Sequence, residues 1–313
     1  MRKVFEPNVP QAAWVRLAER EGLLVIAPNG WNVSENQGSG DQQTWNDLRG
    51  PQPGVISEED DAGFVDAVVE RELPARGFDP REVFVVGSSN GGMLTFRVMI
   101  EFPERFAAAA PVIANLPENA IDDPPVAKPI VIINGDADPL MPWEGGVVGF
   151  GTGAPVRSGV DTLNYWRRVH GLETTEGDLE LLPDTEPTDG TRILRAEYRP
   201  VPDAPPLVTL YRIFNGGHSL PLLATDPQSP LPASFGRRSL DANGADLAWA
   251  FFLPFLAPPG PRIDLDASGT RDVFDLVEFF RQLDAGSRAA DLNCDDALDA
   301  ADATAFLTFL EQD

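Results

Sequence analysis

One segment, residues 83–93 (VFVVGSSNGGM), constrains the fold more than any other. Its first four residues form a short apolar run, which is typical of a strand buried on both faces of a parallel sheet. Residues 90–101 then carry apolar side chains at helical spacing without a proline. The sequence therefore predicts a strand, a tight turn and a helix in direct succession.

The turn reads Gly-x-Ser-x-Gly, with Ser89 at its centre. Between a strand and a helix, this pattern puts the serine on a strained turn at the carboxyl edge of the sheet, and the glycines leave room for the backbone. A flexible glycine-rich surface loop is the alternative interpretation. Because the flanking strand and helix are both legible, we interpret Ser89 as a nucleophile. Ser88 occupies a variable position of the pattern.

Strands and helices alternate along much of the remaining chain. Apolar patterns predict strands at 23–27, 106–113, 130–134, 191–199 and 207–214, and helices at 11–20, from 57 towards 74, at 161–170 and at 239–256. Ser57 followed by Asp60 resembles a capping box for the second of these helices. The alternation predicts an α/β domain with a mainly parallel sheet flanked by helices, whose sites lie at the carboxyl ends of the strands.

A serine nucleophile needs a base, and the chain has two histidines. His170 lies at the end of a predicted helix, where a charge interaction with the helix terminus or a surface position is expected. His218 follows Asn-Gly-Gly directly after the strand 207–214, in a loop at the carboxyl end of a strand. We therefore interpret His218 as the base; a histidine that caps a glycine turn is the alternative.

The carboxylate that orients the base should lie between the serine and the histidine in the chain. Asp136 and Asp138 both follow the strand 130–134. Asp138 lies further round the turn, where its side chain can fold back towards the histidine, whereas Asp136 can stabilise the turn itself. We favour Asp138 as the acid and predict that the backbone N–H of Asn90 is one oxyanion donor. A second donor of the HGG type has no counterpart in this sequence.

The segments SSNGGM, NGDADPLMPWEGG and NGGHSLP make residues 11–256 similar to a known family. They resemble the polyhydroxybutyrate depolymerase and feruloyl esterase group of α/β hydrolases, which also includes acetylxylan esterases. The resemblance implies the α/β-hydrolase fold, with Ser89 as nucleophile, Asp138 as acid and His218 as base.

Two tryptophans are candidates for substrate contacts under this resemblance. Trp143 occupies the place of a family tyrosine, and Trp45 lies in a family-like Trp-Asn-Asp segment within the long loop 31–53. Either indole is suited to flank an acyl or aromatic group; packing beneath a loop is the alternative. The chain departs from the family at Asn134, where a histidine is usual, and at Leu220, which stands in place of a tryptophan.

The start of the chain also departs from the family pattern. Members of the group have a further N-terminal region with an export signal and the central strand that ends in the HGG loop. Residues 1–14 contain no apolar segment that would serve as a signal peptide. We expect either a longer native protein or a sheet that closes without that strand, and we favour the longer protein.

Composition excludes several other classes of protein. The chain has 313 residues, with 24 basic against 49 acidic side chains and a net charge of -25, which argues against nucleic acid or an anionic membrane as a partner. No apolar run approaches the ~20 residues that a membrane helix requires. Cys294 is the single cysteine, so a disulfide framework is excluded and a zinc site is not expected.

A proline-rich linker at 257–261 separates the predicted esterase domain, 1–256, from a compositionally different tail, 262–313. The tail contains two twelve-residue loops with oxygen ligands at calcium-loop spacing, each leading into an apolar helix. The predicted ligands are Asp264, Asp266, Ser268, Thr270, Asp272 and Asp275 in the first loop, and Asp291, Asn293, Asp295, Ala297, Asp299 and Asp302 in the second.

The repeated loops resemble dockerin modules, so we expect a small all-α EF-hand pair that binds two Ca²⁺ ions. Asp296 weakens the second loop because it stands at position 6, where glycine allows the sharp turn. An acidic helical hairpin with solvated aspartates is the alternative interpretation. A dockerin-like tail implies a cohesin-like or cell-surface partner, and calcium sites of this kind favour secretion.

Together these features predict a secreted serine carboxylesterase that needs no cofactor for catalysis. The expected substrates are polymeric esters, either polyhydroxyalkanoates or plant polysaccharides that carry feruloyl or acetyl groups. The alternative is an impaired, truncated hydrolase that serves as a calcium-dependent binding or attachment protein.

Overall fold

The computed structural model describes residues 12–37, 43–50, 56–76, 82–120, 126–149, 154–227, 230–256, 265, 273–285, 290, 300, 302–304 and 306. The chain divides into two compact units, Met1–Leu256 and Ala257–Asp313. None of the described helices is long and apolar enough to cross a membrane.

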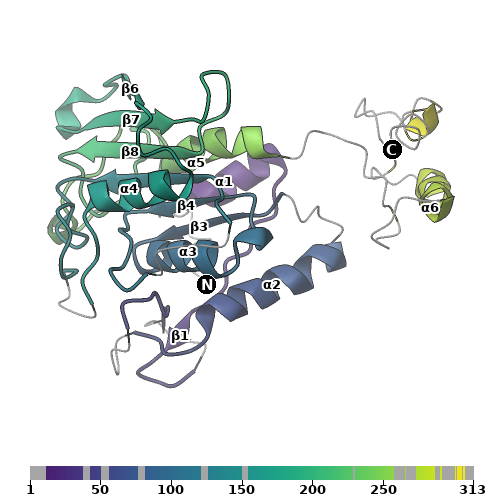
Figure 1. The fold of residues 1–313 in the computed structure, drawn as a ribbon, viewed down its shortest axis with the longest axis horizontal. Helices are drawn as coiled ribbons and strands as arrows, with labels where there is room; N and C mark the ends of the chain where they lie inside the picture. The colour runs from purple at the N-terminus through teal and green to yellow at the C-terminus, as the bar shows by residue number, and fades with distance from the viewer. Residues whose placement is uncertain are drawn as a thin grey trace. The chain divides into compact units, whose positions relative to one another are not determined.

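A six-stranded sheet with the order β3-β4-β5-β8-β7-β6 forms the centre of the first unit (Figure 1). The parallel strands are β3 (Phe84–Ser88), β4 (Ala108–Val112), β5 (Ile130–Gly135) and β8 (Val208–Phe214), and the antiparallel strands are β7 (Arg192–Tyr198) and β6 (Asp178–Leu181). Since parallel strands end at the same edge, the loops after β3, β5 and β8 meet there. The predicted mainly parallel sheet is confirmed.

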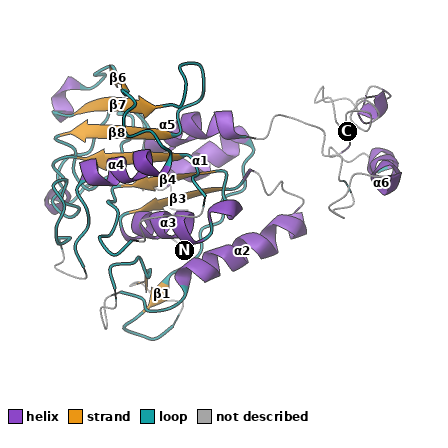
Figure 2. Cartoon of the chain, in the orientation of Figure 1, coloured by secondary structure: helices purple, strands orange, loops and turns teal. Residues whose placement is uncertain are grey.

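Helices cover both faces of this sheet (Figure 2). They are α1 (Ala12–Glu21), α2 (Asp61–Arg76), α3 (Asn90–Glu101), α4 (Gly159–Val169) and α5 (Gly244–Phe252). Alternation along the strands separates two cores: Ile130 and Ile132 of β5 pack with residues of α3 and α4, whereas Val131 and Ile133 pack with residues of α1 and α5. The first unit therefore has three layers, with the sheet between two layers of helices, and the site lies where the parallel strands end.

Short elements complete the first unit. Within the long loop, β1 (Trp31–Asn32) and β2 (Gln43–Thr44) form a small antiparallel pair. The 3₁₀ helices are η3 (Pro103–Arg105), η4 (Pro187–Asp189), η5 (Ala233–Phe235) and η6 (Leu253–Phe255).

The predicted strand at 23–27 is wrong. These residues are described without strand pairing, and Leu24 and Ile26 are 41% and 45% exposed. An apolar run becomes a strand only beside a hydrogen-bonded neighbour, and none of the described strands pairs with this segment. The expectation that residues 83–86 are fully buried is also wrong: β3 is half-buried because it is the edge strand of the described sheet.

Two helix starts differ from the predicted ones. Asp60 rather than Ser57 caps α2, since its Oδ1 accepts the N–H of Gly63 at 3.0 Å. The helix α5 begins at Gly244 instead of residue 239, because Asn243 Oδ1 accepts the N–H of Ala245 at 2.9 Å. A side-chain acceptor therefore sets both boundaries.

The second unit contains α6 (Val273–Asp284) and a small core of Phe279, Ala290 and Phe306. The rings of Phe279 and Phe306 stack at 5.3 Å between centroids. Of the predicted calcium ligands, Asp275 and Asp302 are described, and both are fully buried. The other ten lie outside the described residues. Within the described part of the chain, no three His, Cys, Asp or Glu side chains form a group that could hold a metal ion.

Candidate active site

Ser89 lies on a strained turn between β3 and α3. Its φ is 57° and its ψ is -121°, a conformation that costs a non-glycine residue roughly 1–3 kcal/mol. Two backbone hydrogen bonds stabilise the turn. The N–H of Ser89 donates to the carbonyl of Val112 at 2.9 Å, and the N–H of Met93 donates to the carbonyl of Ser89 at 3.0 Å. The local structure is thus the strand-turn-helix that the Gly-x-Ser-x-Gly pattern predicts.

The glycines around Ser89 differ in what they permit. A Cβ at Gly87 would overlap the carbonyl of Gly91, and one at Gly92 would lie 2.6 Å from Ala114 Cβ. A Cβ at Gly91 would meet Trp45 at 3.8 Å, an ordinary contact distance. Residues 87 and 92 must therefore be glycine because neighbouring atoms approach them closely. Residue 91 has room for a Cβ.

His218 reaches Ser89 from the loop after β8. Its Nε2 lies 2.9 Å from Ser89 Oγ, and its side chain is 8% exposed. The N–H groups of Gly217 and His218 donate to the carbonyls of Arg237 and Phe235 at 2.7 and 2.6 Å. This backbone pairing fixes the direction in which the imidazole leaves its loop.

Asp138 contacts the other side of the imidazole. Its Oδ2 lies 2.7 Å from His218 Nδ1, while its Oδ1 accepts the N–H groups of Leu140 and Met141, each at 2.8 Å. Because a carboxylate only accepts, His218 Nδ1 carries the proton and Nε2 accepts from the hydroxyl of Ser89. The three candidate catalytic residues therefore form one continuous hydrogen-bonded relay.

Asp136, the other candidate, faces away from this relay. Its Oδ2 accepts from Arg212 Nε at 3.0 Å, and its Oδ1 accepts the N–H of Asn215 at 2.7 Å. It ties the turn after β5 to β8, in keeping with the structural role that the sequence allowed.

Asn90, the predicted oxyanion donor, is the first residue of α3. The first N–H groups of a helix have no partner inside it and carry the positive end of its dipole. The location suits the predicted role of this N–H towards an acyl oxygen on Ser89.

The two candidate tryptophans have different environments. Trp143 is 7% exposed, its ring lies against Gly159, and the guanidinium of Arg212 stacks 4.6 Å from the ring centroid. Trp143 therefore has the packed environment that the alternative interpretation described, and its substrate role stays a prediction. Trp45 is half-buried beside the start of α3.

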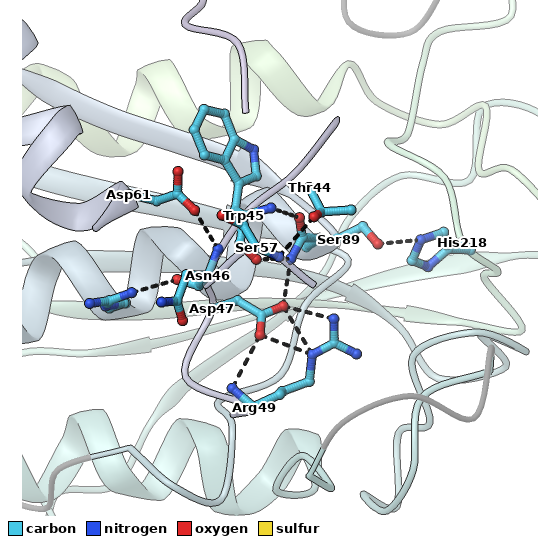
Figure 3. A network of polar contacts seen from close by, with 11 residues as sticks. Thr44, Trp45, Asn46, Asp47, Arg49, Ser57, Asp61, Ser89 and His218 are labelled. Carbon is cyan, nitrogen blue, oxygen red and sulfur yellow. Dashed lines mark hydrogen bonds and ion pairs between the residues drawn. The ribbon is translucent and has the colours of Figure 1, made fainter. Parts of the chain in front are cut away.

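A buried ion pair beside the nucleophile turn was not predicted. Asp47 is fully buried and contacts Arg49, itself 6% exposed, through Nη2–Oδ2 at 2.8 Å. Figure 3 shows this pair on one side of Ser89 and His218 on the other. The family-like Trp-Asn-Asp segment was a signal for Asp47, but the sequence does not reveal its long-range contacts.

Asn134 also has a structural role. It is 3% exposed, its Oδ1 accepts the N–H of Ala114 at 3.0 Å and its Nδ2 donates to the carbonyl of Ala114 at 2.8 Å. The departure from the family histidine thus lies in a contact between β5 and the loop after β4.

His170, the second histidine, lies apart from the relay. Its Nε2 donates to the carbonyl of Lys128 at 3.0 Å, and burial lowers its pKa below the ordinary value. The half-buried ring therefore ties the end of α4 to the segment before β5, instead of the surface position that was expected.

A parallel sheet that carries a serine on a strand-to-helix turn, with a His and an Asp on loops after later strands, defines the α/β-hydrolase class of fold and site. The chain order Ser89, Asp138, His218 is the order of that class.

Comparison with known proteins finds similarity to proteins that are named as esterases. It is 32% identical over 251 residues to "Putative esterase NocK" of Nocardia uniformis subsp. tsuyamanensis, covering 77% of this chain and 66% of NocK. It is 30% identical over 108 residues to the bifunctional acetylxylan esterase/xylanase XynS20E of Neocallimastix patriciarum, covering 34% of this chain and 14% of that protein. The chain thus spans slightly less than two thirds of one relative and a small part of the other.

No family model matches the sequence. Among solved structures, esterase PE8 is similar with a TM-score of 0.43 and 16% identity, over 80% of this chain and 88% of PE8.

Proposed function

We propose that the chain is a serine carboxylic ester hydrolase. The observation that carries this proposal is the continuous relay from Ser89 Oγ through His218 to Asp138, with distances of 2.9 and 2.7 Å. The sequence relationship to NocK supports the same class of reaction.

In the proposed reaction, Ser89 Oγ attacks the ester carbonyl carbon while His218 Nε2 takes its proton. Asp138 keeps Nδ1 protonated and stabilises the imidazolium. The charge on the carbonyl oxygen is stabilised by the N–H of Asn90. His218 then gives the proton to the leaving alkoxide, and water hydrolyses the acyl-enzyme by the same steps, so that no cofactor is needed.

The substrate class that we propose is an acyl ester of a polymer. The acetylxylan esterase/xylanase relative supports an acetylated polysaccharide. Feruloylated polysaccharides enter the proposal through the motif resemblance of residues 11–256. Polyhydroxyalkanoates remain in the proposal through the motif resemblance of residues 11–256.

The test is hydrolysis of p-nitrophenyl acetate, methyl ferulate, acetylated xylan and polyhydroxybutyrate by the wild type and by Ser89→Ala. We expect activity on at least one ester and a loss of about 10³-fold or more in the variant. Ser88→Ala is the matched control, because it removes the neighbouring hydroxyl and should keep the activity. Equal activity of Ser89→Ala and wild type would contradict the proposal.

We further propose that the second unit binds two Ca²⁺ ions and acts outside the cell on a cohesin-like or cell-surface partner. The buried carboxylates of Asp275 and Asp302 support this proposal, since each occupies the last ligand position of its loop. Asp275 Oδ1 also accepts the N–H of Leu265 at 2.7 Å, which joins the two ends of the first loop.

Calcium titration of the full chain by calorimetry tests the metal proposal. We expect binding that weakens when Asp275→Asn or Asp302→Asn removes one charge, and no change for the exposed Asp284→Asn. A titration without heat, and without a calcium-dependent rise in the unfolding temperature, would contradict it.

A further inference from the structure

The side chain of Asn90 joins the nucleophile turn to residues 43–49. Its Oδ1 accepts the N–H of Trp45 at 2.7 Å, and its Nδ2 donates to the carbonyl of Trp45 at 3.0 Å. The same Nδ2 donates to Asp47 Oδ2 at 2.5 Å. Three hydrogen bonds thus tie the residue after the nucleophile to one short segment.

Asp47 determines which way round the carboxamide of Asn90 lies. A carboxylate only accepts, so the NH₂ end must face it, and the oxygen end is left to accept from Trp45. Arg49 pairs with this buried carboxylate: its Nε lies 3.1 and 2.9 Å from the two oxygens of Asp47. The charge on Arg49 therefore fixes the orientation of Asn90 through Asp47.

Residues 43–49, to which Asn90 is hydrogen-bonded, are themselves hydrogen-bonded to two helices. Arg97 of α3 donates through Nη1 to the carbonyl of Asn46 at 2.8 Å, and Asp61 of α2 accepts the N–H of Asn46 at 2.7 Å. Figure 3 shows this network beside Ser89, away from His218. The side chain of Asn90 is consequently hydrogen-bonded to a segment that α2 and α3 hold in place.

The position of Asn90 matters because its own N–H is the proposed oxyanion donor. Such a donor must lie about 2.7–3.1 Å from the oxygen on which charge develops, and loss of one donor costs roughly 10²–10³ in kcat. Asn90 follows a residue of strained φ at the end of a half-buried edge strand. The hydrogen bonds of its side chain add a directed restraint to this turn.

We propose that Asn90 is a positioning residue: its carboxamide, oriented by Asp47 and Arg49, holds its own backbone N–H in place for the oxyanion. This inference rests on the proposed ester hydrolysis. It assigns the buried Asp47–Arg49 pair a function in the reaction, although neither side chain contacts the substrate in the proposed mechanism.

Steady-state kinetics of Asn90→Ala and Asn90→Asp on the ester that the wild type hydrolyses best test the inference. We expect kcat of Asn90→Ala to fall about 10- to 100-fold with KM within about 2-fold, because the donor persists but is no longer held. Asn164→Ala is the matched control: this exposed asparagine of α4 accepts from Arg167 Nη1 at 3.0 Å, outside the network around Asn90, and its kcat should stay near that of the wild type.

Asn90→Asp adds a second measurement, the pH dependence of kcat, which a purely structural role of residue 90 would not change in the same way. An ionised carboxylate at 90 repels Asp47 and cannot donate to Trp45, whereas the protonated acid can donate again. The ratio of its kcat to that of the wild type should therefore rise as the pH falls from about 8 to about 6.

Each outcome decides between the two proposals. A wild type that hydrolyses no ester overturns the proposed function and this inference together. An active wild type with unchanged kcat in Asn90→Ala overturns the inference alone, as does a change confined to KM or to the unfolding temperature. If Asn90→Ala does not fold, the pH dependence of Asn90→Asp decides, and a flat ratio overturns the inference.

Discussion

The two halves of the site are supported in different ways. Asp138 and His218 stand on loops that follow β5 and β8, neighbouring strands inside the sheet, and every residue of β5 is buried. Ser89 stands at the end of β3, the edge strand of the described sheet, whose residues are all half-buried. The loops of the acid and the base thus follow strands inside the sheet, whereas the nucleophile turn follows an edge strand and is tied by side-chain hydrogen bonds to residues 45 and 47.

This difference matters because apolar packing is non-directional and hydrogen bonds are directional. The central half of the site, which carries Asp138 and His218, should tolerate small changes in the shape of the surrounding side chains, because many packing contacts contribute to it. The edge half depends on a few groups, and Asn90, Asp47 and Arg49 are the ones closest to the nucleophile.

The largest effect should come from the central half, at the orienting carboxylate. Asp138→Asn leaves the size of the side chain unchanged but destroys its preference for a protonated Nδ1, so kcat should fall about 10⁴-fold. Asp136→Asn, two residues earlier, should retain most activity because Asp136 contacts Arg212 instead. Comparable losses in both variants would show that the turn, rather than the relay, is what both aspartates maintain.

The next prediction compares the free energy of unfolding that is lost when one ion pair in each half of the site is broken. Arg49→Met leaves Asp47 as an uncompensated buried charge and should lower the free energy of unfolding by about 3–5 kcal/mol. Arg212→Met breaks the more exposed pair with Asp136 and the stacking on Trp143, and should cost about 1–2 kcal/mol. Urea unfolding measures both, and equal costs would remove the distinction between the halves.

A smaller effect is expected at the glycines of the nucleophile turn. Gly87→Ala forces a Cβ against the carbonyl of Gly91 and should cost about 1–3 kcal/mol. Gly91→Ala meets no atom closer than 3.8 Å and should change the free energy of unfolding by less than about 1 kcal/mol, with either sign. Thermal unfolding of the two variants is the measurement, and a reversed order would contradict the local geometry.

The smallest effect concerns the histidine outside the relay. Burial lowers the pKa of His170 in the folded protein, so the unfolded chain binds more protons as the pH falls below the ordinary histidine value. The stability that neutral His170 contributes is therefore present at neutral pH and is lost on acidification through that window. Between pH about 7.5 and about 5, wild type should lose more unfolding free energy than His170→Gln.

Local pattern predicted the nucleophile strand, turn and helix well. The expected helix at 90–101 is confirmed, since α3 spans Asn90–Glu101. Here apolar period, glycine spacing and the absence of proline all act within a dozen residues, so the sequence determines the structure at short range.

Other features escaped prediction because they depend on distant partners. The segment 23–27 has a strand-like composition but lacks a described neighbouring strand, and Trp143 is enclosed by Arg212, which lies far along the chain. The network of Asp47 and Asn90 joins residues separated by 43 positions. No periodicity in a single sequence encodes such contacts, even where the residues themselves attract attention.

The contact between Asn90 and Trp45 has the form of a strand pairing. In an antiparallel pair, two residues exchange both of their N–H and C=O groups, and here one carboxamide offers both groups to the backbone of Trp45. A side chain thus replaces one peptide unit of a neighbouring strand at the edge of the sheet. A side chain must both donate and accept to keep this pairing, so alanine at residue 90 removes both contacts at once, and aspartate keeps the donor only when it is protonated.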